Sequence, residues 1–232
     1  LLMVNGIDFI NNLDIIIKHI AESALMNMML KSESKYGTCI VMETKTGKIK
    51  AISNLGWKPD GTYDEDYNYA VAYSSEPGST FKVLVMAGAL SERAVTATST
   101  MEESGPLQVG DYVIRTWNNE YRGTQTMTEV IQHSSNVGMV SVGKKLGKER
   151  LLRYIRAFGF GKPTGVDLED ESSPILQKDS DWGDIDLATA SFGQGIAVTP
   201  LQMVRAVAAL ANDGWLMEPH MVKSIMDTKG KV

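Results

Sequence analysis

The sequence predicts an α+β fold, because its helical segments and its few strands are segregated along the chain. Apolar residues recur at helical spacing in residues 14–31, and helical patterns return in several segments after residue 79. The runs at residues 38–43 and 48–54 are instead short and rich in strand-forming residues. Strands and helices do not alternate regularly, which argues against a doubly wound parallel sheet.

The first part of the chain is predicted to form a helix, a hairpin and a second helix. We expect the helix at residues 14–31 to be amphipathic and to end before Gly37, with its methionines filling the core. Residues 44–47 would form the hairpin turn, where Gly47 supplies a positive φ. Residues 55–75 lack periodicity, which predicts a loop. A helix follows from residue 79 to about residue 92, with these residues facing inward: Phe81, Val85, Ala89 and Leu90.

The second part of the chain is predicted to be mainly helical. Residues 94–123 are mixed, and Gly105-Pro106 and Gly110 separate short strands. Thr199-Pro200 is typical of an N-cap followed by proline at the first helical position, and this helix would run to about residue 211. The other helices are expected at residues 127–132, 137–146 and 149–158.

Composition excludes several classes of protein. The 232 residues are 43% hydrophobic and carry a net charge of −5, without a cluster of Lys and Arg that would neutralise nucleic-acid phosphates. The single cysteine, Cys39, excludes an internal disulfide and a thiolate metal cage. No apolar run reaches the roughly 18 residues of a membrane span, so we expect this chain to be soluble and globular.

Familiar metal and nucleophile motifs are absent from the sequence. The three histidines, His19, His133 and His220, are far apart, and no His-Glu-x-x-His pair or Gly-x-Ser-x-Gly turn occurs. We therefore expect no metal site and no cofactor. His133 is interpreted as a partly exposed residue at a helix end.

A serine paired with a lysine is the remaining candidate for chemistry. A Ser-x-x-Lys spacing on a helix places both side chains on one face, where a partly desolvated lysine can accept the serine proton. The spacing begins at Ser32, Ser79 and Ser141, so it is weak by itself. Only Ser79, with Lys82, follows a Pro-Gly turn and opens a helix, which favours it as the nucleophile.

A second motif supports this choice of serine. Ser134-Ser135-Asn136 is the one Ser-x-Asn sequence in the chain and lies between two predicted helices. Helix capping explains it when it is taken alone, because serine and asparagine are favoured N-cap residues. Together with Ser79 and Lys82, it matches the motif set of active-site-serine penicillin-recognising enzymes.

These segments resemble the transpeptidase domain of class B penicillin-binding proteins, within the β-lactamase-like superfamily. The resemblance runs from about Gly6 to the end of the chain. It implies an antiparallel sheet packed with helices, plus a helical subdomain at roughly residues 76–212. The segments that carry it are Glu-Pro-Gly-Ser-Thr-Phe-Lys at 76–82, Ser-Ser-Asn at 134–136, residues 191–203 from Ser-Phe-Gly-Gln-Gly to Leu-Gln-Met, and residues 41–47 and 158–168.

The resemblance implies a D,D-transpeptidase that crosslinks peptidoglycan stem peptides. Ser79 would attack the carbonyl between two terminal D-alanines, and Lys82 would accept its proton. Ser134 would relay protons to the leaving amine, and Asn136 would hold the amide of the donor peptide. β-Lactams would be trapped as acyl-enzymes. The resemblance also implies a membrane-anchored parent facing the cell-wall compartment, with a glycan polymerase and division or elongation proteins as partners.

One family motif is missing from its expected place. The family carries a Lys-Thr/Ser-Gly strand downstream of Ser-x-Asn, whereas Lys45-Thr46-Gly47 lies upstream, in the predicted hairpin turn. We therefore expect residues 1–232 to be a partial transpeptidase domain with an incomplete sheet, which acylates with penicillin poorly or not at all. The alternatives are a serine β-lactamase, a β-lactam-sensing receptor domain and a catalytically silent scaffold.

Overall fold

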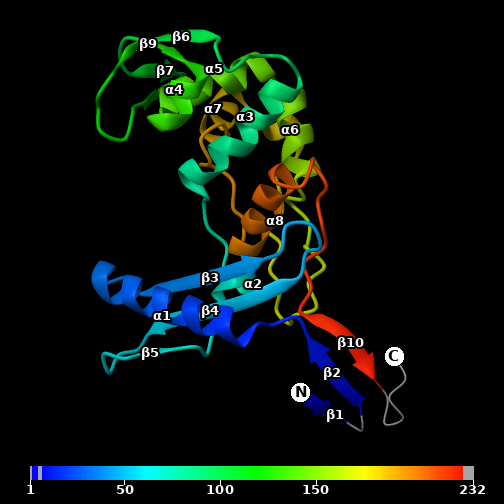
Figure 1. The fold of residues 1–232 in the computed structure, drawn as a ribbon. Coiled ribbons are helices and arrows are strands. Elements are labelled where there is room, and N and C mark those ends of the chain that lie inside the picture. The colour runs from blue at the N-terminus through cyan, green and yellow to red at the C-terminus, as the bar shows by residue number, and fades with distance from the viewer. Residues whose placement is uncertain (1, 5–6, 227–232) are drawn as a thin grey trace. The chain divides into compact units, whose positions relative to one another are not determined.

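The computed structural model describes residues 2–4 and 7–226 (Figure 1). The chain forms two compact units, which are described separately. Unit 1 comprises the described residues up to residue 74, residues 162–173 and residues 199–226, and unit 2 comprises residues 75–161 and 174–198. Helices and antiparallel strands occur in separate segments, so the predicted α+β class is confirmed.

Unit 1 contains the sheets. Strands β3 (Tyr36–Met42), β4 (Ile49–Trp57) and β5 (Tyr63–Asp64) form one antiparallel sheet, and helix α1 (Ile15–Ser32) packs on β3 and β4 (Figure 1). The β3–β4 hairpin is the predicted one, and Gly47 in its turn has a φ of +79°. A second antiparallel sheet has the order β1 (Leu2–Val4), β2 (Ile7–Asn11), β10 (Val222–Met226). The segment Lys45-Thr46-Gly47 thus lies in a hairpin turn, as predicted.

The helix α1 begins where the sequence indicated but buries less than expected. Asp14 caps it by accepting hydrogen bonds from the backbone N–H groups of Ile16 and Ile17. Its buried residues are Ala21 and Met29, whereas Met28 is 60% exposed. The prediction that the methionines fill the core is therefore wrong for Met28. Apolar residues occur on several faces of this helix, so the pattern does not identify the buried one.

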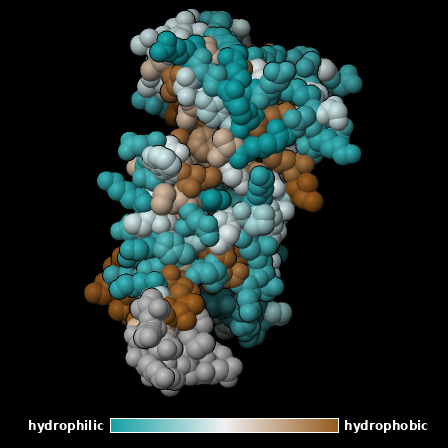
Figure 2. Space-filling model, turned by 90° about the vertical axis from the view of Figure 1, so that its right-hand side faces the viewer, coloured by the Kyte–Doolittle hydropathy of each residue, from teal (hydrophilic) through white to brown (hydrophobic). Residues whose placement is uncertain are grey.

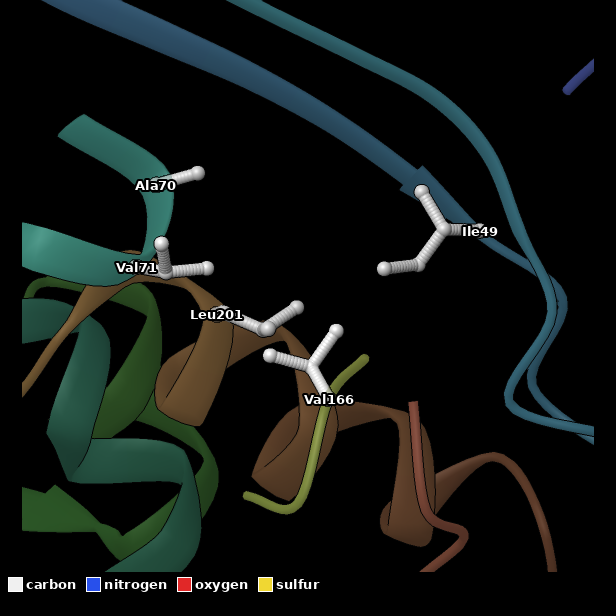
Figure 3. Packing of buried hydrophobic residues seen from close by; sticks show 5 residues of the cluster. All are labelled: Ile49, Ala70, Val71, Val166 and Leu201. Carbon is white, nitrogen blue, oxygen red and sulfur yellow. The ribbon is translucent and has the colours of Figure 1, made fainter. Parts of the chain in front are cut away.

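The core of unit 1 connects its sheet to two helices (Figure 3). Helix α2 (Tyr69–Ala72) contributes two of its residues, and helix α8 (Pro200–Leu210) contributes one. The α8 cap is the predicted one, with Thr199 and Gln202 forming a reciprocal capping box. The expected loop at residues 55–75 is wrong where it contains β5 and α2. The cluster consists of Ile49, Ala70, Val71, Val166 and Leu201.

Unit 2 is mainly helical. The turn η1 (Gly78–Phe81) leads into α3 (Lys82–Ser91), and α5 (Asn136–Leu146) contacts α3, α4, α6 and α7. The prediction of an inward face on α3 is confirmed except for Leu90, which is 41% exposed. The other helices are α4 (Met127–Gln132), α6 (Lys148–Ala157), the short η2 (Asp179–Asp181) and α7 (Asp184–Ala190). The sequence did not predict η2 or α7.

Two small antiparallel sheets of two strands each complete unit 2. Strand β6 (Thr100–Glu103) pairs with β9 (Gly123–Thr126), and β7 (Leu107–Val109) pairs with β8 (Tyr112–Ile114). The helical subdomain was expected at roughly 76–212, whereas helix α8 packs within unit 1. Among the described residues, no helix combines the length and apolar character needed to cross a membrane. Figure 2 shows hydrophilic residues over much of one face, interrupted by apolar groups.

Candidate active site

A tight backbone turn presents Ser79 at the start of η1. Gly78 adopts a φ of +57°, which glycine tolerates at little cost, and its N–H donates to the carbonyl of Gly193 at 2.9 Å. The carboxylate of Glu76 accepts a hydrogen bond from the N–H of Gly195 at 2.8 Å. Ser79 itself is exposed. The segment after α7 therefore fixes the turn that carries the predicted nucleophile.

A glycine is required at position 193 because the backbone of Gly78 lies very close to it. A Cβ atom at this position would lie 2.0 Å from the carbonyl oxygen of Gly78, and the residue has a φ of +83°. The backbones are also joined farther along, where Ser75 and Val198 exchange hydrogen bonds of 3.0 and 2.9 Å. The close approach to Gly78 explains the glycine at position 193.

Lys82 lies three residues after Ser79, at the first position of α3, and is 2% exposed. The backbone N–H of Lys82 donates to the carbonyl of Ser79, so the two residues share one turn. Its Nζ donates to the carbonyl oxygen of Ser134 at 2.6 Å and to Ser134 Oγ at 2.9 Å. It also donates to Asn136 Oδ1 at 2.8 Å. The structure thus brings together Lys82, Ser134 and Asn136.

Burial changes the acidity of this lysine. Removal from solvent lowers the pKa of Lys82 from 10.5 to about 8, because the ammonium form loses hydration. All three of its hydrogen-bond acceptors are neutral, so none compensates as a carboxylate would. At pH 7.4 a pKa near 8 leaves about one fifth of the lysine neutral, against about one part in a thousand for an ordinary lysine. Lys82 can therefore accept a proton at physiological pH.

The Ser-Ser-Asn motif both caps a helix and contacts the lysine. Ser135 is the N-cap of α5, and its Oγ accepts a hydrogen bond from the N–H of Gly138 at 2.8 Å. Ser134, just before it, adopts a left-handed φ of +53°, an uncommon conformation for serine. That conformation accompanies the contact of both Ser134 oxygens with Lys82. Within this motif, Ser135 therefore caps the helix and Ser134 contacts the lysine.

Asn136 is held on two sides. Its Oδ1 accepts from Lys82, and its Nδ2 donates to the carbonyl of Arg115 at 2.9 Å. One further hydrogen on Nδ2 and one further lone pair on Oδ1 are not used by these bonds. The side chain is therefore oriented and still able to contact a ligand.

A cleft of about 490 Å³ lies beside two of the candidate residues, Ser79 and Ser134, within unit 2. Ser79 and Ser134 line it together, and His133 lines it as well, at the C-terminal cap of α4. His133 is half-buried, which agrees with its interpretation as a partly exposed helix-end residue. The sequence did not identify the polar and aromatic residues that complete the lining, among them Glu103, Trp117 and Arg122.

The other two Ser-x-x-Lys pairs have different surroundings. Ser32 ends α1, where its exposed Oγ donates to the carbonyl of Met28 at 2.7 Å. Ser141 and Lys144 lie inside α5 and line a separate cleft of about 410 Å³. Within the described part of the chain, no group of three or more histidine, cysteine, aspartate or glutamate residues is arranged to hold a metal ion.

Comparison with known proteins identifies the family. The family model of the penicillin-binding protein transpeptidase domain matches residues 37–232. Stage V sporulation protein D of Bacillus subtilis is 37% identical over 96% of this chain and 36% of its own length. Penicillin-binding protein PbpB of Mycolicibacterium smegmatis is 30% identical over 87% of this chain and 32% of its own length. The chain thus spans about a third of the length of these relatives.

Solved structures agree with this assignment. A peptidoglycan synthetase from Bifidobacterium adolescentis superposes with a TM-score of 0.88 at 29% identity, covering 99% of this chain and 42% of that one. Penicillin-binding protein 3 from Mycobacterium tuberculosis, solved in complex with ampicillin, superposes with a TM-score of 0.89 at 26% identity, covering 98% of this chain and 52% of that one. The resemblance carried by the sequence motifs is confirmed: the chain belongs to the family of penicillin-binding protein transpeptidase domains.

Proposed function

We propose that this chain carries the acylation site of a peptidoglycan D,D-transpeptidase, with Ser79 as the nucleophile. The observation that supports it most strongly is the buried Lys82, with a pKa of about 8, one turn from Ser79 and hydrogen-bonded to Ser134 and Asn136. The names of the relatives support the same chemistry: a relative from Neisseria meningitidis is called a probable peptidoglycan D,D-transpeptidase.

The acylation step can be written with these groups. Neutral Lys82 accepts the proton of Ser79 as Ser79 Oγ bonds to the carbonyl carbon of the penultimate D-alanine. The tetrahedral intermediate expels the amine of the terminal D-alanine, which receives a proton from Lys82 through Ser134. Ser134 suits this relay because its hydroxyl both accepts and donates hydrogen bonds and lies 2.9 Å from Lys82 Nζ.

Transfer of the acyl group completes the reaction. The amine of a second stem peptide attacks the acyl-serine carbonyl and loses a proton to Lys82, and the Ser79 oxygen leaves and is reprotonated. Asn136, oriented by Lys82 and Arg115, would contact the donor amide with its remaining hydrogen-bonding capacity. A β-lactam would enter the first step through its strained amide and remain on Ser79.

The test is covalent labelling by a penicillin, followed by intact-mass measurement and peptide mapping. We expect an adduct on Ser79, none in Ser79→Ala, and an unchanged adduct in the matched control Ser32→Ala, which removes the exposed serine of another Ser-x-x-Lys pair. An adduct of equal yield in Ser79→Ala would contradict the assignment.

The labelling rate tests a second expectation. No Lys-Thr-Gly follows Ser134 in these 232 residues, and loss of one oxyanion donor costs about 10²–10³ in rate in other enzymes. We therefore expect labelling of this polypeptide to be slower by at least about that factor than labelling of a relative that carries the motif. Rapid stoichiometric acylation of the 232-residue polypeptide would contradict this expectation.

The partners and location follow from the same proposal. Stem peptides ending in D-Ala-D-Ala would be the substrates, β-lactams the inhibitors, and a glycan polymerase with division or elongation proteins the partners. The parent protein would act on the cell-wall side of the membrane.

Turnover of a chromogenic cephalosporin, by contrast, would favour a serine β-lactamase.

A further inference from the structure

A buried carboxylate lies next to the cleft and has no part in the mechanism above. Glu103, the last residue of β6, is 1% exposed. Its Oε1 accepts a hydrogen bond from Ser135 Oγ at 3.1 Å, and its Oε2 accepts one from Gln125 Nε2. Gln125 lies in the paired strand β9 and is 2% exposed, and its Oε1 is 2.8 Å from His133 Nδ1. Four side chains therefore form one continuous network.

The chemistry of the network fixes the direction of each hydrogen bond. An ionised carboxylate can only accept, so the Gln125 group that faces Glu103 must be its NH₂. The Gln125 carbonyl oxygen then faces His133, and an oxygen can only accept. His133 must therefore carry a hydrogen on Nδ1, and in the neutral ring Nε2 must be unprotonated.

We infer that Glu103 is a positioning residue which, through Gln125, fixes neutral His133 as the Nδ1–H tautomer and so leaves Nε2 as a hydrogen-bond acceptor. No protein group among the described residues donates to Nε2. His133 lines the same cleft as Ser79 and Ser134, so this acceptor suits a ligand that brings an N–H donor, such as a peptide amide. That last role rests on the proposed function, whereas the tautomer does not.

Glu103 also accepts a hydrogen bond from Ser135, the middle residue of the Ser-Ser-Asn motif. Ser135 Oγ accepts from Gly138 and gives its single hydrogen to Glu103, so the cap of α5 has one orientation. Ser134 and Asn136, on either side of Ser135, are the residues that accept from Lys82. Through Gln125 and Ser135, one buried carboxyl group therefore acts on both the histidine and the segment that carries the acceptors of the lysine.

Other charges near His133 do not replace Glu103. Glu129 lies one turn earlier on α4, where its carboxylate is engaged by Thr126 in a capping box. Glu120 and Arg122 line the cleft but form an ion pair with each other at 2.8 Å. Gln125 is the side chain hydrogen-bonded to His133 Nδ1 in the described structure.

The test is ¹⁵N NMR of the histidine rings in the unmodified chain at about pH 8.5, above the ordinary histidine pKa of about 6.5. His133→Gln identifies the His133 signals among the three histidines. We expect a protonated Nδ1 and an unprotonated Nε2. The opposite tautomer would mean that Gln125 is turned and Glu103 holds a proton, and it would overturn the inference. This measurement needs no Glu103 variant, so misfolding cannot obscure it.

A matched pair of variants tests the cause. Glu103→Gln introduces an amide that can donate or accept, so Gln125 is free to turn, and we expect the ratio of His133 tautomers to shift about tenfold toward Nε2–H. Glu102→Gln changes the neighbouring exposed carboxylate, which accepts from Thr124 at 2.7 Å, and should leave the ratio unchanged. Equal ratios in the two variants would exclude Glu103 as the positioning residue.

The acylation rate separates this inference from the proposed function. We expect Glu103→Gln to acylate about tenfold more slowly than Glu102→Gln. The expected tautomer together with no adduct on Ser79 would refute the proposed function and leave the positioning role. An adduct on Ser79 together with the opposite tautomer would refute the positioning role and leave the proposed function.

Discussion

Replacement of Gly193 by alanine is the sharpest test of how the fold positions Ser79. The new Cβ would lie 2.0 Å from the carbonyl oxygen of Gly78 and 2.8 Å from Phe81 Cβ. Contacts below about 3.0 Å do not occur, so the two backbones must separate by about 1 Å or more. The turn that carries Ser79 must move with them.

The loss of stability expected for Gly193→Ala has three contributions. A left-handed alanine costs about 1–2 kcal/mol, and loss of the 2.9 Å hydrogen bond from Gly78 to Gly193 costs about 1 kcal/mol. We therefore expect destabilisation of about 2–4 kcal/mol, allowing for the steric conflict. A displacement of about 1 Å at the nucleophile costs about 10²-fold in acylation rate.

Two other glycines serve as controls. Gly78 has a positive φ, but a Cβ added there would meet no atom within 4 Å, so Gly78→Ala should show the conformational cost of about 1–2 kcal/mol alone. Gly105 has open space and no positive φ, so Gly105→Ala should be nearly neutral. Urea unfolding and penicillin labelling measure both effects. A Gly193→Ala variant with the stability and labelling rate of Gly105→Ala would refute the close-approach argument.

Three further predictions concern stability, each measured by urea unfolding. Ser135→Ala removes the cap of α5 and leaves one oxygen of buried Glu103 unpaired, so it should destabilise by about 1–3 kcal/mol; no loss would contradict the capping role. Asp167→Asn should lower the free energy of unfolding by about 1–2 kcal/mol, because the carboxylate accepts hydrogen bonds from the backbone N–H groups of Met221 and Val222, both at 2.6 Å, whereas an amide has only one acceptor oxygen. An unchanged urea midpoint would contradict this role of Asp167. The pKa of Lys82 is about 8 in the folded chain and about 10.5 in the unfolded chain. Between these two pH values the unfolded chain binds more protons, so the free energy of unfolding should rise by up to roughly 3 kcal/mol from pH 8 to 10.5. Lys82→Met should abolish that rise, and an equal rise in the variant would exclude Lys82 as its source.

Much of the local structure could be predicted from the sequence. Thr199 caps its helix, as predicted, because its side-chain oxygen can satisfy one of the first free N–H groups, and this signal needs no tertiary information. Gly47 likewise marked the hairpin turn. The exposed side of α1 could not be predicted, because apolar residues occur on several of its faces and only packing decides among them.

The candidate site was predictable to a different degree at each residue. The Ser79–Lys82 spacing follows from helix geometry, and the preceding turn distinguished it from two other pairs. Contact between Lys82 and Ser134, 52 positions apart, depends on how α3 packs on α5 and was reached through the family resemblance. Glu103 and Gln125 gave no signal, because a polar residue in a short strand is usually solvated.

In the proposed mechanism, neutral Lys82 activates Ser79. The most direct measurement is the rate constant of penicillin adduct formation at Ser79 as a function of pH, followed by mass spectrometry. Because burial lowers the pKa of Lys82 to about 8, the rate constant should rise with pH and level off above an apparent pKa near 8. A rate constant that does not change between pH 6 and 9.5, or an adduct on another residue, would contradict the account.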